Sequence, residues 1–434
     1  GKMFLVDLKE GRIISDDEIK KKVFTRNPYS QWVRENQINL EDLSSRKKIL
    51  AADKSSLRMR QIFFGYTTED IKFIISSMVA QGEEPTGSMG NDTPLAVLSH
   101  RPQLLFHYFK QLFAQVTNPA IDSIREELVM SMSINLGKEQ NLLAESPMHC
   151  QKLKLTHPIL TIEEIDKIKS LDQQNLKSVV HSTIFPVSEK SGALKKAMEG
   201  LCSEVSKSIE NGATIIVLSD RGVDNANAAI PSLLAVSGVH HHLLRNKTRT
   251  KVGIVIESGE PREMMHFALL IGYGAGGICP YLAYETAVKT AEEGIFIKDT
   301  KSEDVIPNYI KSTRKGLFKI IAKMGISTIQ SYRGAQVFEA VGLSDDFINQ
   351  FFNGTPSRVA GAGIDVIERE TLARHQLAYK NIESLPIPLD PGGNYHWRRG
   401  GEEHMINPNS IALLQHSTRS NDYKLFKKFS RNAD

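Results

Sequence analysis

Three short polar runs could do chemistry, because each lies at the end of an apolar run that has the character of a buried strand. These runs are Ser219, Asp220 and Arg221, then Glu257 and Ser258, then Ser331, Tyr332 and Arg333. The C-terminal ends of parallel strands are where α/β barrels build active sites. Helix capping by Asp220 and Ser258, with ion pairing by Arg221, would explain the same residues without catalysis. Both interpretations stay open from the residues alone.

The segment "GYGAGG" has the G-x-G-x-x-G spacing of dinucleotide sites at Gly272, Gly274 and Gly277. In such sites the motif follows a strand and opens a helix, because the pyrophosphate binds at the helix N-terminus. Here it follows a helical run, residues 261–271, and precedes an apolar segment, which is the reverse order. The sequence therefore predicts a structural helix-to-strand turn and not a phosphate cradle.

Histidines and cysteines show no metal or nucleophile signature. His240 to His242 are consecutive, and neighbours on a helix point about 100° apart, so they do not converge on one ion. We expect surface histidines at a helix end. Cys150, Cys202 and Cys279 are far apart and lack the CxxC spacing of zinc or iron-sulfur sites. Cys279 has no assignable His or acid partner, so a buried thiol is predicted.

Composition predicts an ordinary globular protein. Of 434 residues, 41% are hydrophobic and 24% charged, and 54 basic against 50 acidic residues leave a net charge of +4. This balance argues against a nucleic-acid or membrane-surface partner. No apolar run approaches the ~18 residues that span a bilayer, and no signal-peptide core is visible. We expect a cytoplasmic protein of two or three domains whose basic run 423–434 is a solvated tail.

Alternating apolar and amphipathic runs dominate the chain after residue 175. Strand-like segments at 178–187, 213–222, 251–258, 276–281 and 326–332 alternate with helical segments at 191–212, after Pro231, at 261–271 and at 314–325. Such units predict parallel strands joined by right-handed crossovers, hence an α/β barrel or a doubly wound sheet, with the barrel favoured. Earlier in the chain we expect strands within 3–14, a helix from Ser15 and a helix ending at Gly82.

The stretch 87–126 is rich in turn and cap residues but poor in catalytic ones. Its first part predicts a tight loop over 87–94, with Thr93 as an N-cap and Pro94 at the first helical position. Apolar and aromatic residues of 101–113 then recur at helical spacing. This pattern predicts a helix packed into the core.

A second constrained loop is expected after this helix. Asn118 precedes Pro119, which disfavours helical geometry at Asn118, and Asp122 or Ser123 would cap the next helix. Two constrained loops therefore flank one packed segment. Loops of this kind fix backbone polar groups in space, which suits the wall of a passage or an interface.

Four long segments closely resemble the central domain of the large subunit of glutamate synthase, which makes glutamate from glutamine and 2-oxoglutarate. They are residues 90–131 ("GNDTPLAVLSHRPQLLFHYF…"), 218–245 ("LSDRGVDNANAAIPSLLAV…"), 255–285 ("VIESGEPREMMHFALLIGYG…") and 323–343 ("KMGISTIQSYRGAQVFEAVGL"). The resemblance covers nearly the whole chain and is far more specific than any single short motif.

The resemblance implies an α/β fold, an incomplete or deviating (β/α) barrel without bound flavin. It also implies a connector from the amidotransferase domain at 1–50, the central domain at 51–385, and an extended arm opening the synthase domain at 386–434. The family's N-terminal cysteine nucleophile and its three closely spaced cluster cysteines do not occur in this sequence. FMN and an iron-sulfur cluster are therefore expected outside this chain, which is expected to be a fragment without catalysis of its own.

By the same resemblance, Met89, Thr117 and Asn118 line the constriction of an ammonia tunnel, although packing and capping would also explain them. The expected partners are the amidotransferase and synthase domains of the same polypeptide, with ferredoxin or a small NADPH-dependent subunit for the whole enzyme. Two alternatives stay open. One is a self-sufficient flavin- or phosphate-binding barrel enzyme that uses Arg221, Glu257 and the glycine-rich turn, and the other is a structural interface module without a tunnel.

Overall fold

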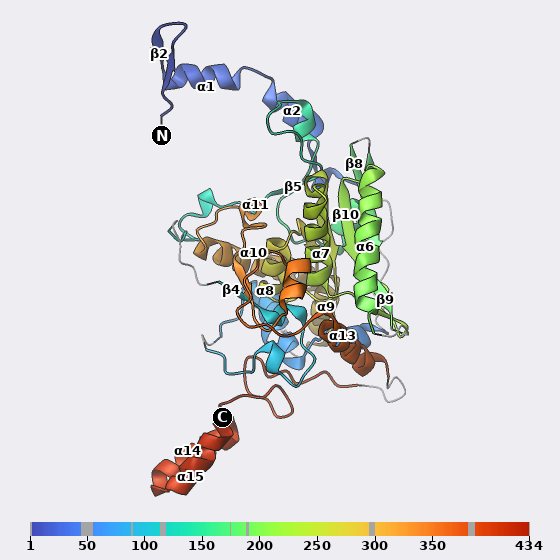
Figure 1. Ribbon diagram of the computed structural model, residues 1–434, viewed down its shortest axis with the longest axis vertical. Helices are drawn as coiled ribbons and strands as arrows, with labels where there is room; N and C mark the ends of the chain where they lie inside the picture. The colour runs from blue at the N-terminus through green and yellow to red at the C-terminus, as the bar shows by residue number, and fades with distance from the viewer. Residues whose placement is uncertain are drawn as a thin grey trace.

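The N-terminal part of the chain extends away from a larger body (Figure 1). The computed structural model describes residues 2–44, 55–87, 90–112, 119–173, 175–187, 191–294, 300–380 and 387–433. The first range holds β1 (Leu5–Asp7), β2 (Arg12–Ile14), α1 (Asp16–Phe24), α2 (Tyr29–Asn36), β3 (Ile38–Asn39) and η1 (Leu40–Asp42). The predicted strands and helix start are confirmed, because β1 pairs with β2 and the Ser15 side chain caps α1.

A five-stranded sheet forms the centre of the body. Its order is β13 (Gly277–Cys279), β12 (Gly253–Glu257), β10 (Ile215–Ser219), β8 (Leu176–Ser182) and β7 (Asp172–Gln173). The first four strands are parallel, and β7 forms a hairpin with β8. Every residue of β10, β12 and β13 is buried, as in strands covered on both faces. The predicted parallel strands are confirmed.

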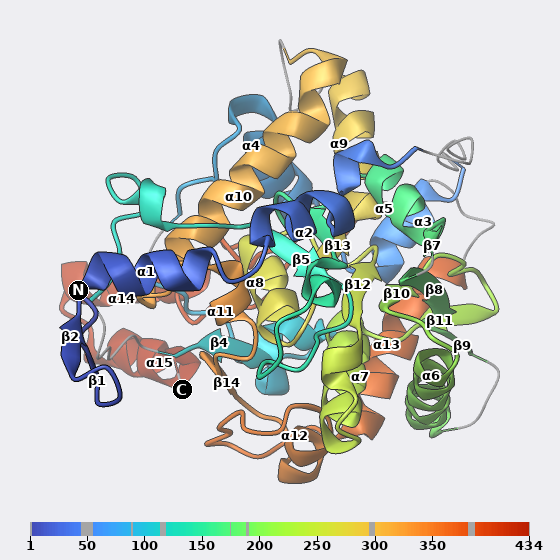
Figure 2. The same ribbon diagram turned by 90° about the horizontal axis from the view of Figure 1, so that it is seen from above.

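Helices between and after these strands surround the sheet (Figure 2). They are α6 (Ala193–Glu210), α7 (Ser232–Arg245), α8 (Met264–Gly272), α9 (Tyr281–Glu293) and α10 (Val305–Lys323). Along α6, Leu194, Leu201 and Val205 are buried at helical spacing, and full burial of one such side chain stabilises the fold by about 1.5–3 kcal/mol. Within the described residues the sheet does not close, so the architecture is mixed α/β.

The region before the sheet contains the helix predicted to end at Gly82. It follows α3 (Leu57–Phe63) and consists of a π-helical turn, η2 (Asp70–Ile75), continued by α4 (Ser76–Gln81). Ile71 and Met78 are among its buried residues, and Gly82 ends it in a left-handed conformation with φ of 61°. The remaining elements of this region up to the sheet are η3 (Ala96–Leu98), η4 (Leu105–Tyr108), β4 (Phe109–Gln111), η5 (Glu127–Val129), β5 (Ile134–Leu136), η6 (Pro147–Cys150), β6 (Leu153–Leu155) and α5 (Ile162–Lys169).

The helix predicted over 101–113 does not form in the described part of that segment. The chain makes only the short turn η4 and then enters β4, which pairs with β14 (Phe338–Ala340). Phe109 contacts the rings of Tyr273 and Phe352, and this pairing with distant residues outweighs local helical spacing. Thr93 caps no helix either, since its amide bonds to the Asn91 side chain in a turn. The prediction that the aromatic residues belong to the core is confirmed for Tyr108 and Phe109, whereas Phe113 lies outside the described residues.

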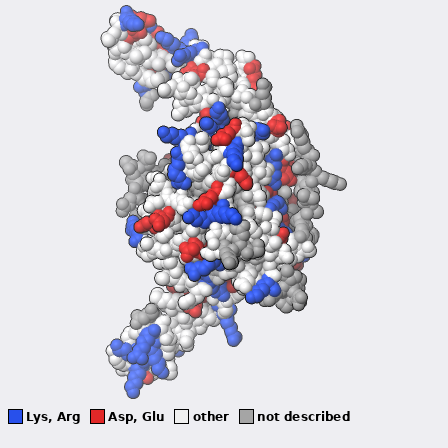
Figure 3. Space-filling view, turned by 45° about the vertical axis from the view of Figure 1, so that its right-hand side comes forward, with Lys and Arg blue, Asp and Glu red and all other residues white. Residues whose placement is uncertain are grey.

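Two further predictions for local structure are wrong. Residues 326–332 contain the short helix α11 (Ile329–Tyr332) where a strand was expected. The basic run predicted as a tail forms α15 (Tyr423–Ala433), which packs against α14 (Pro408–Ser420). Lys and Arg side chains gather on this protruding helix pair at the lower end of Figure 3. None of the helices in the described part of the chain combines the length and apolar character needed to cross a membrane.

The last elements of the body follow or flank the sheet. They are β9 (Ile184–Pro186) paired with β11 (Asn227–Ala229), η7 (Arg249–Lys251), η8 (Ser302–Asp304), α12 (Asp345–Phe351) and α13 (Ile364–Tyr379). α13 packs against both α3 and α6. It therefore holds the beginning and the middle of the chain together.

Candidate functional site

Five of the predicted residues meet at the C-terminal ends of two adjacent strands, and we call them the strand-end cluster: Ser219, Asp220, Arg221, Glu257 and Ser258. The buried Glu257 accepts hydrogen bonds from Ser219 Oγ at 2.6 Å and Arg221 Nε at 2.7 Å. Lys169 Nζ lies 2.8 Å from the same carboxylate. Burial opposes ionisation of Glu257, but the charges of Arg221 and Lys169 outweigh it and lower the pKa.

Asp220 is the second buried carboxyl of this cluster. It accepts hydrogen bonds from Ser258 Oγ at 2.5 Å and from the Gly259 amide at 3.1 Å. Burial raises the pKa of Asp220 to about 7 against the effect of these bonds. Arg221 stacks over the Tyr281 ring, with its guanidinium carbon 4.1 Å from the ring centre. The polar groups of the cluster are thus bonded to one another.

Carboxylates also occupy the N-termini of two helices that begin near these strand ends. Glu260 accepts a hydrogen bond of 2.7 Å from the Ser232 amide at the start of α7. Glu368 of α13 accepts one of 3.0 Å from the Gly192 amide at the start of α6. A helix N-terminus is the usual position for a phosphate group. A phosphate would have to displace these carboxylates, which disfavours the alternative of a flavin- or phosphate-binding enzyme.

The glycine-rich turn joins α8 to β13, as its sequence context predicts. Gly274 has a φ of +121°, and a Cβ there would lie 2.5 Å from the His240 ring. A Cβ on Gly272 would lie 2.7 Å from Phe338. Arg249 donates to the Gly274 carbonyl at 2.9 Å. Close packing explains these glycines, so the structural interpretation is confirmed.

The third predicted polar run lies at the other end of the sheet. Ser331 and Tyr332 belong to α11, and Arg333 follows it. A Cβ on Gly276, which precedes β13, would lie 3.5 Å from the Arg333 guanidinium. This position is at the start of the strand, whereas the strand-end cluster lies at the opposite ends. The expectation that all three runs share one edge is therefore wrong, because residues 326–332 do not form a strand.

The remaining candidates are packing residues. His241 is buried in α7, which contradicts the expectation of surface histidines. Burial lowers the pKa of His240 to about 2. Cys279 is fully buried, and burial raises the pKa of its thiol, so the predicted buried thiol is confirmed. Among the described residues, no group of three or more His, Cys, Asp and Glu could hold a metal ion.

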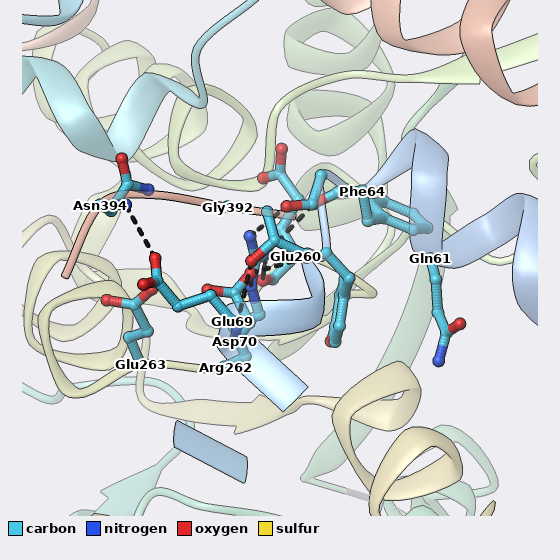
Figure 4. Close-up of polar contacts among 12 residues, drawn as sticks. Gln61, Phe64, Glu69, Asp70, Glu260, Arg262, Glu263, Gly392 and Asn394 are labelled. Atoms are coloured by element: carbon cyan, nitrogen blue, oxygen red, sulfur yellow. Dashed lines mark hydrogen bonds and ion pairs between the residues drawn. The ribbon is translucent and has the colours of Figure 1, made fainter. Parts of the chain in front are cut away.

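A second polar region forms where residues 390–406, which we call the docking segment, lie against the start of η2. The buried Glu69 accepts hydrogen bonds of 2.8 to 3.2 Å from four consecutive backbone amides, residues 393–396. Figure 4 shows Asn394 directed at Glu69. Such donors replace the hydration that a buried carboxylate loses. Glu69 therefore fixes this part of the docking segment to the body.

Arg262 connects this region to the loop after the strand-end cluster. Its Nε donates to Asp70 at 2.9 Å, and its terminal nitrogens donate to the carbonyls of Phe64 and Gly65 at 3.1 and 2.6 Å. The guanidinium also lies over the Tyr66 ring, 4.4 Å from its centre. Every one of these partners comes from the residues around η2, so one buried arginine holds two distant parts of the chain together.

The other end of the docking segment contacts the loop predicted over 87–94. Asp92 lies 2.8 Å from His404 Nδ1 and accepts a hydrogen bond of 2.8 Å from the Ile406 amide. Burial opposes ionisation of Asp92, but the bonds from Ile406 and His404 outweigh it and lower the pKa. Nearby, Arg101 forms an ion pair of 2.8 Å with Asp390.

Sequence reasoning missed Glu69, Asp92 and Arg262. Their contacts join residues very far apart, 324 positions for Glu69 and Gly393, so no local pattern reveals them. The sequence offered one signal, the consecutive glycines Gly392 and Gly393. Both have a positive φ in the structure. A Cβ on Gly392 would lie 2.5 Å from the Glu69 Cβ, which explains why glycine is needed there.

Both predicted loops attach to α10 through their described flanks. Glu83 forms an ion pair with Lys315, and the Ile121 amide donates to the Ala322 carbonyl at 2.9 Å. These two positions on α10 are two helical turns apart, about 10 Å along the axis. The predicted tunnel residues Met89, Thr117 and Asn118 themselves lie outside the described residues, so their role stays a prediction.

Comparison with known proteins agrees with the sequence resemblance. Residues 59–344 match the glutamate synthase central domain family, and residues 1–32 match the class-II glutamine amidotransferase family. These matches assign the mixed α/β domain to a known class of protein. The chain belongs to the glutamate synthase central domain family.

Three relatives illustrate the similarity. The chain is 46% identical to the glutamate synthase [NADPH] large chain of Bacillus subtilis, covering 100% of this chain and 28% of that protein. It is 39% identical to glutamate synthase [NADH] of Schizosaccharomyces pombe, with 99% and 21% covered. It is 38% identical to the chloroplastic ferredoxin-dependent glutamate synthase of Oryza sativa, with 99% and 27% covered. The chain thus spans about a quarter of the length of these relatives.

Similarity to solved structures is weak. The flavin-binding domain of baker's yeast flavocytochrome b2 aligns with a TM-score of 0.32 and 9% identity, covering 74% of this chain and 97% of that one. These values are too low to define the fold. The architecture therefore rests on the strand order and helix positions of this chain itself.

Proposed function

We propose that this chain is the segment of a glutamate synthase that links the glutaminase and synthase domains and lines the passage for ammonia between them. The observation that carries the proposal is the family match over residues 59–344, combined with two loops anchored on one helix. In this proposal the chain performs no chemistry of its own. The whole enzyme would form L-glutamate from L-glutamine and 2-oxoglutarate.

The anchoring of both loops on α10 supports a passage that they line together. Ammonia must stay unprotonated and away from bulk water to be transferred, which requires a narrow, closed path with fixed walls. Anchors about 10 Å apart would hold two loops within reach of each other across such a path. Met89, Thr117 and Asn118 remain the residues that we assign to its constriction.

The strand ends support a non-catalytic role for the sheet. Glu257 is neutralised by Lys169 and Arg221, and the start of α6 is occupied by Glu368. We infer that FMN and an iron-sulfur cluster bind elsewhere in the parent enzyme, and that the sheet is a deviating barrel. We keep the proposed division into a connector at 1–50, a central domain at 51–385 and the start of the synthase domain at 386–434. The electron donor, ferredoxin or a nicotinamide, would act on the synthase domain.

The test is a bulky replacement at the proposed constriction in the full-length enzyme. Thr117→Trp should lower the glutamate formed per glutamine hydrolysed, while glutaminase activity and ammonia-dependent glutamate synthesis persist. Thr117→Ser is the matched control and should leave the ratio unchanged. An unchanged ratio with Thr117→Trp would favour the interface module without a passage. Flavin purifying with this chain in stoichiometric amount would instead favour the barrel enzyme.

A further inference from the structure

The docking segment forms a continuous series of bonds between the body and the loop before residue 94. At one end, Glu69 accepts the amides of residues 393–396. Across the segment, His404 Nε2 lies 2.5 Å from the Gly393 carbonyl. At the other end, Asp92 binds both His404 and the Ile406 amide. Glu69 and Asp92 are therefore connected to each other through the docking segment.

In the structure the docking segment is seated, which means that its backbone and Tyr395 bond to carboxylates of the body. Glu69 is only 2% exposed and lies beside Asp70 and Glu263. Burial and the charge of Asp70 raise the pKa of Glu263, which accepts a hydrogen bond of 2.7 Å from Tyr395. Removing the docking segment would leave two carboxyl groups, Glu69 and Glu263, without the segment's donors. Displacing the segment therefore costs free energy, because these carboxyl groups would lose their hydrogen-bond donors.

Asp92 links the seated docking segment to the position of residues 91–93. Its neighbours are fixed, because the Thr93 amide and hydroxyl both bond to Asn91, at 2.9 and 2.7 Å. His404 is almost fully buried, with 6% of its side chain exposed. The pair therefore holds residues 91–93 against the docking segment, which leads directly into α14.

We propose that Glu69 and Asp92 are positioning residues that couple the seating of the docking segment to the transfer of ammonia. The inference rests on the proposed function, because it assumes a passage beside residues 90–93. When the segment is seated, the described side of the loop is fixed and the passage is complete. When the downstream domain pulls the segment away, the loop loses its only acidic contact to that segment among the described residues of 90–93.

The experiment uses the full-length enzyme with Asp92→Asn and the matched control Glu303→Gln. Both changes remove one carboxylate, but Glu303 is 77% exposed and pairs only with Lys301 among the ion pairs of the described residues. Asp92→Asn should lower the glutamate formed per glutamine hydrolysed by about two- to tenfold. Ammonia-dependent glutamate synthesis and the thermal midpoint should stay close to those of the control.

Two further variants separate the possible failures. His404→Gln changes the other partner of the pair and should lower the same ratio. If Thr117→Trp uncouples the enzyme while Asp92→Asn and His404→Gln do not, the positioning role is wrong and the proposed passage stands. If none of the three uncouples it, the proposed function is wrong as well. Equal losses of ammonia-dependent synthesis and coupling would mark Asp92 as a merely structural residue and overturn the proposal.

Discussion

The strand-end cluster and the docking region are both buried and charged, but they use their charges differently. In the cluster, Glu257 is paired with Arg221 and Lys169, side chains of the same folded body. In the docking region, Glu69 is held by backbone amides of a segment 324 positions away. The first arrangement pairs charges within the body, whereas the second joins the body to the docking segment and, through it, to α14. The comparison favours η2, and not the strand ends, as the position of the proposed role in domain linkage.

The largest expected effect comes from replacing Arg262, which joins the two regions. Arg262→Met should lower the free energy of unfolding by about 3–5 kcal/mol, because Asp70 stays buried without its partner. Urea denaturation measures the loss. Arg125→Met is the control, since Arg125 has 88% of its side chain exposed, and it should change stability by less than about 0.5 kcal/mol. Similar losses for both variants would contradict the structure.

A smaller loss of stability is expected that is confined to the docking region and leaves the sheet unchanged. Glu69→Gln keeps the shape but removes the charge that holds residues 393–396, and should cost about 1–3 kcal/mol. Hydrogen exchange should show faster exchange at these amides and unchanged protection in β10. Asp390→Asn, at a side chain 42% exposed on the same segment, should cost less than about 1 kcal/mol. Equal loss of protection in β10 would show that the regions are not separate.

For a change of one pH unit, the smallest effect is a pH dependence specific to the strand ends. Burial raises the pKa of Asp220 from 3.8 to about 7, so the folded state keeps a proton that the unfolded state has already released. The contribution of Asp220 to stability is therefore present at low pH and lost as pH rises towards 7, at about 1.4 kcal/mol per pH unit. Denaturation of the protein and of Asp220→Asn across that range should give a flatter profile for the variant. Parallel profiles would show that Asp220 is ionised throughout.

Local signals predicted much of the fold correctly. Helical spacing over 191–212 and the apolar runs before Ser219 and Glu257 predicted α6, β10 and β12, because each pattern matches the burial that one element needs. The order of helix, glycine-rich turn and strand likewise predicted that Gly274 is structural. The helix over 101–113 failed because β4 pairs with β14, more than 200 residues away, and local spacing does not report such pairing.

The sequence by itself determined the family, the parallel strands and the positions of the strand-end residues. These features depend on contiguous runs whose hydrophobic period and residue types are visible locally. Only the tertiary structure decided that Glu257 is neutralised within the body, that Ser331 lies at the opposite end of the sheet, and that Glu69 and Asp92 hold the docking segment. A buried carboxylate needs partners in space and not in sequence. The residues that hold the docking segment are therefore ones that the sequence did not reveal.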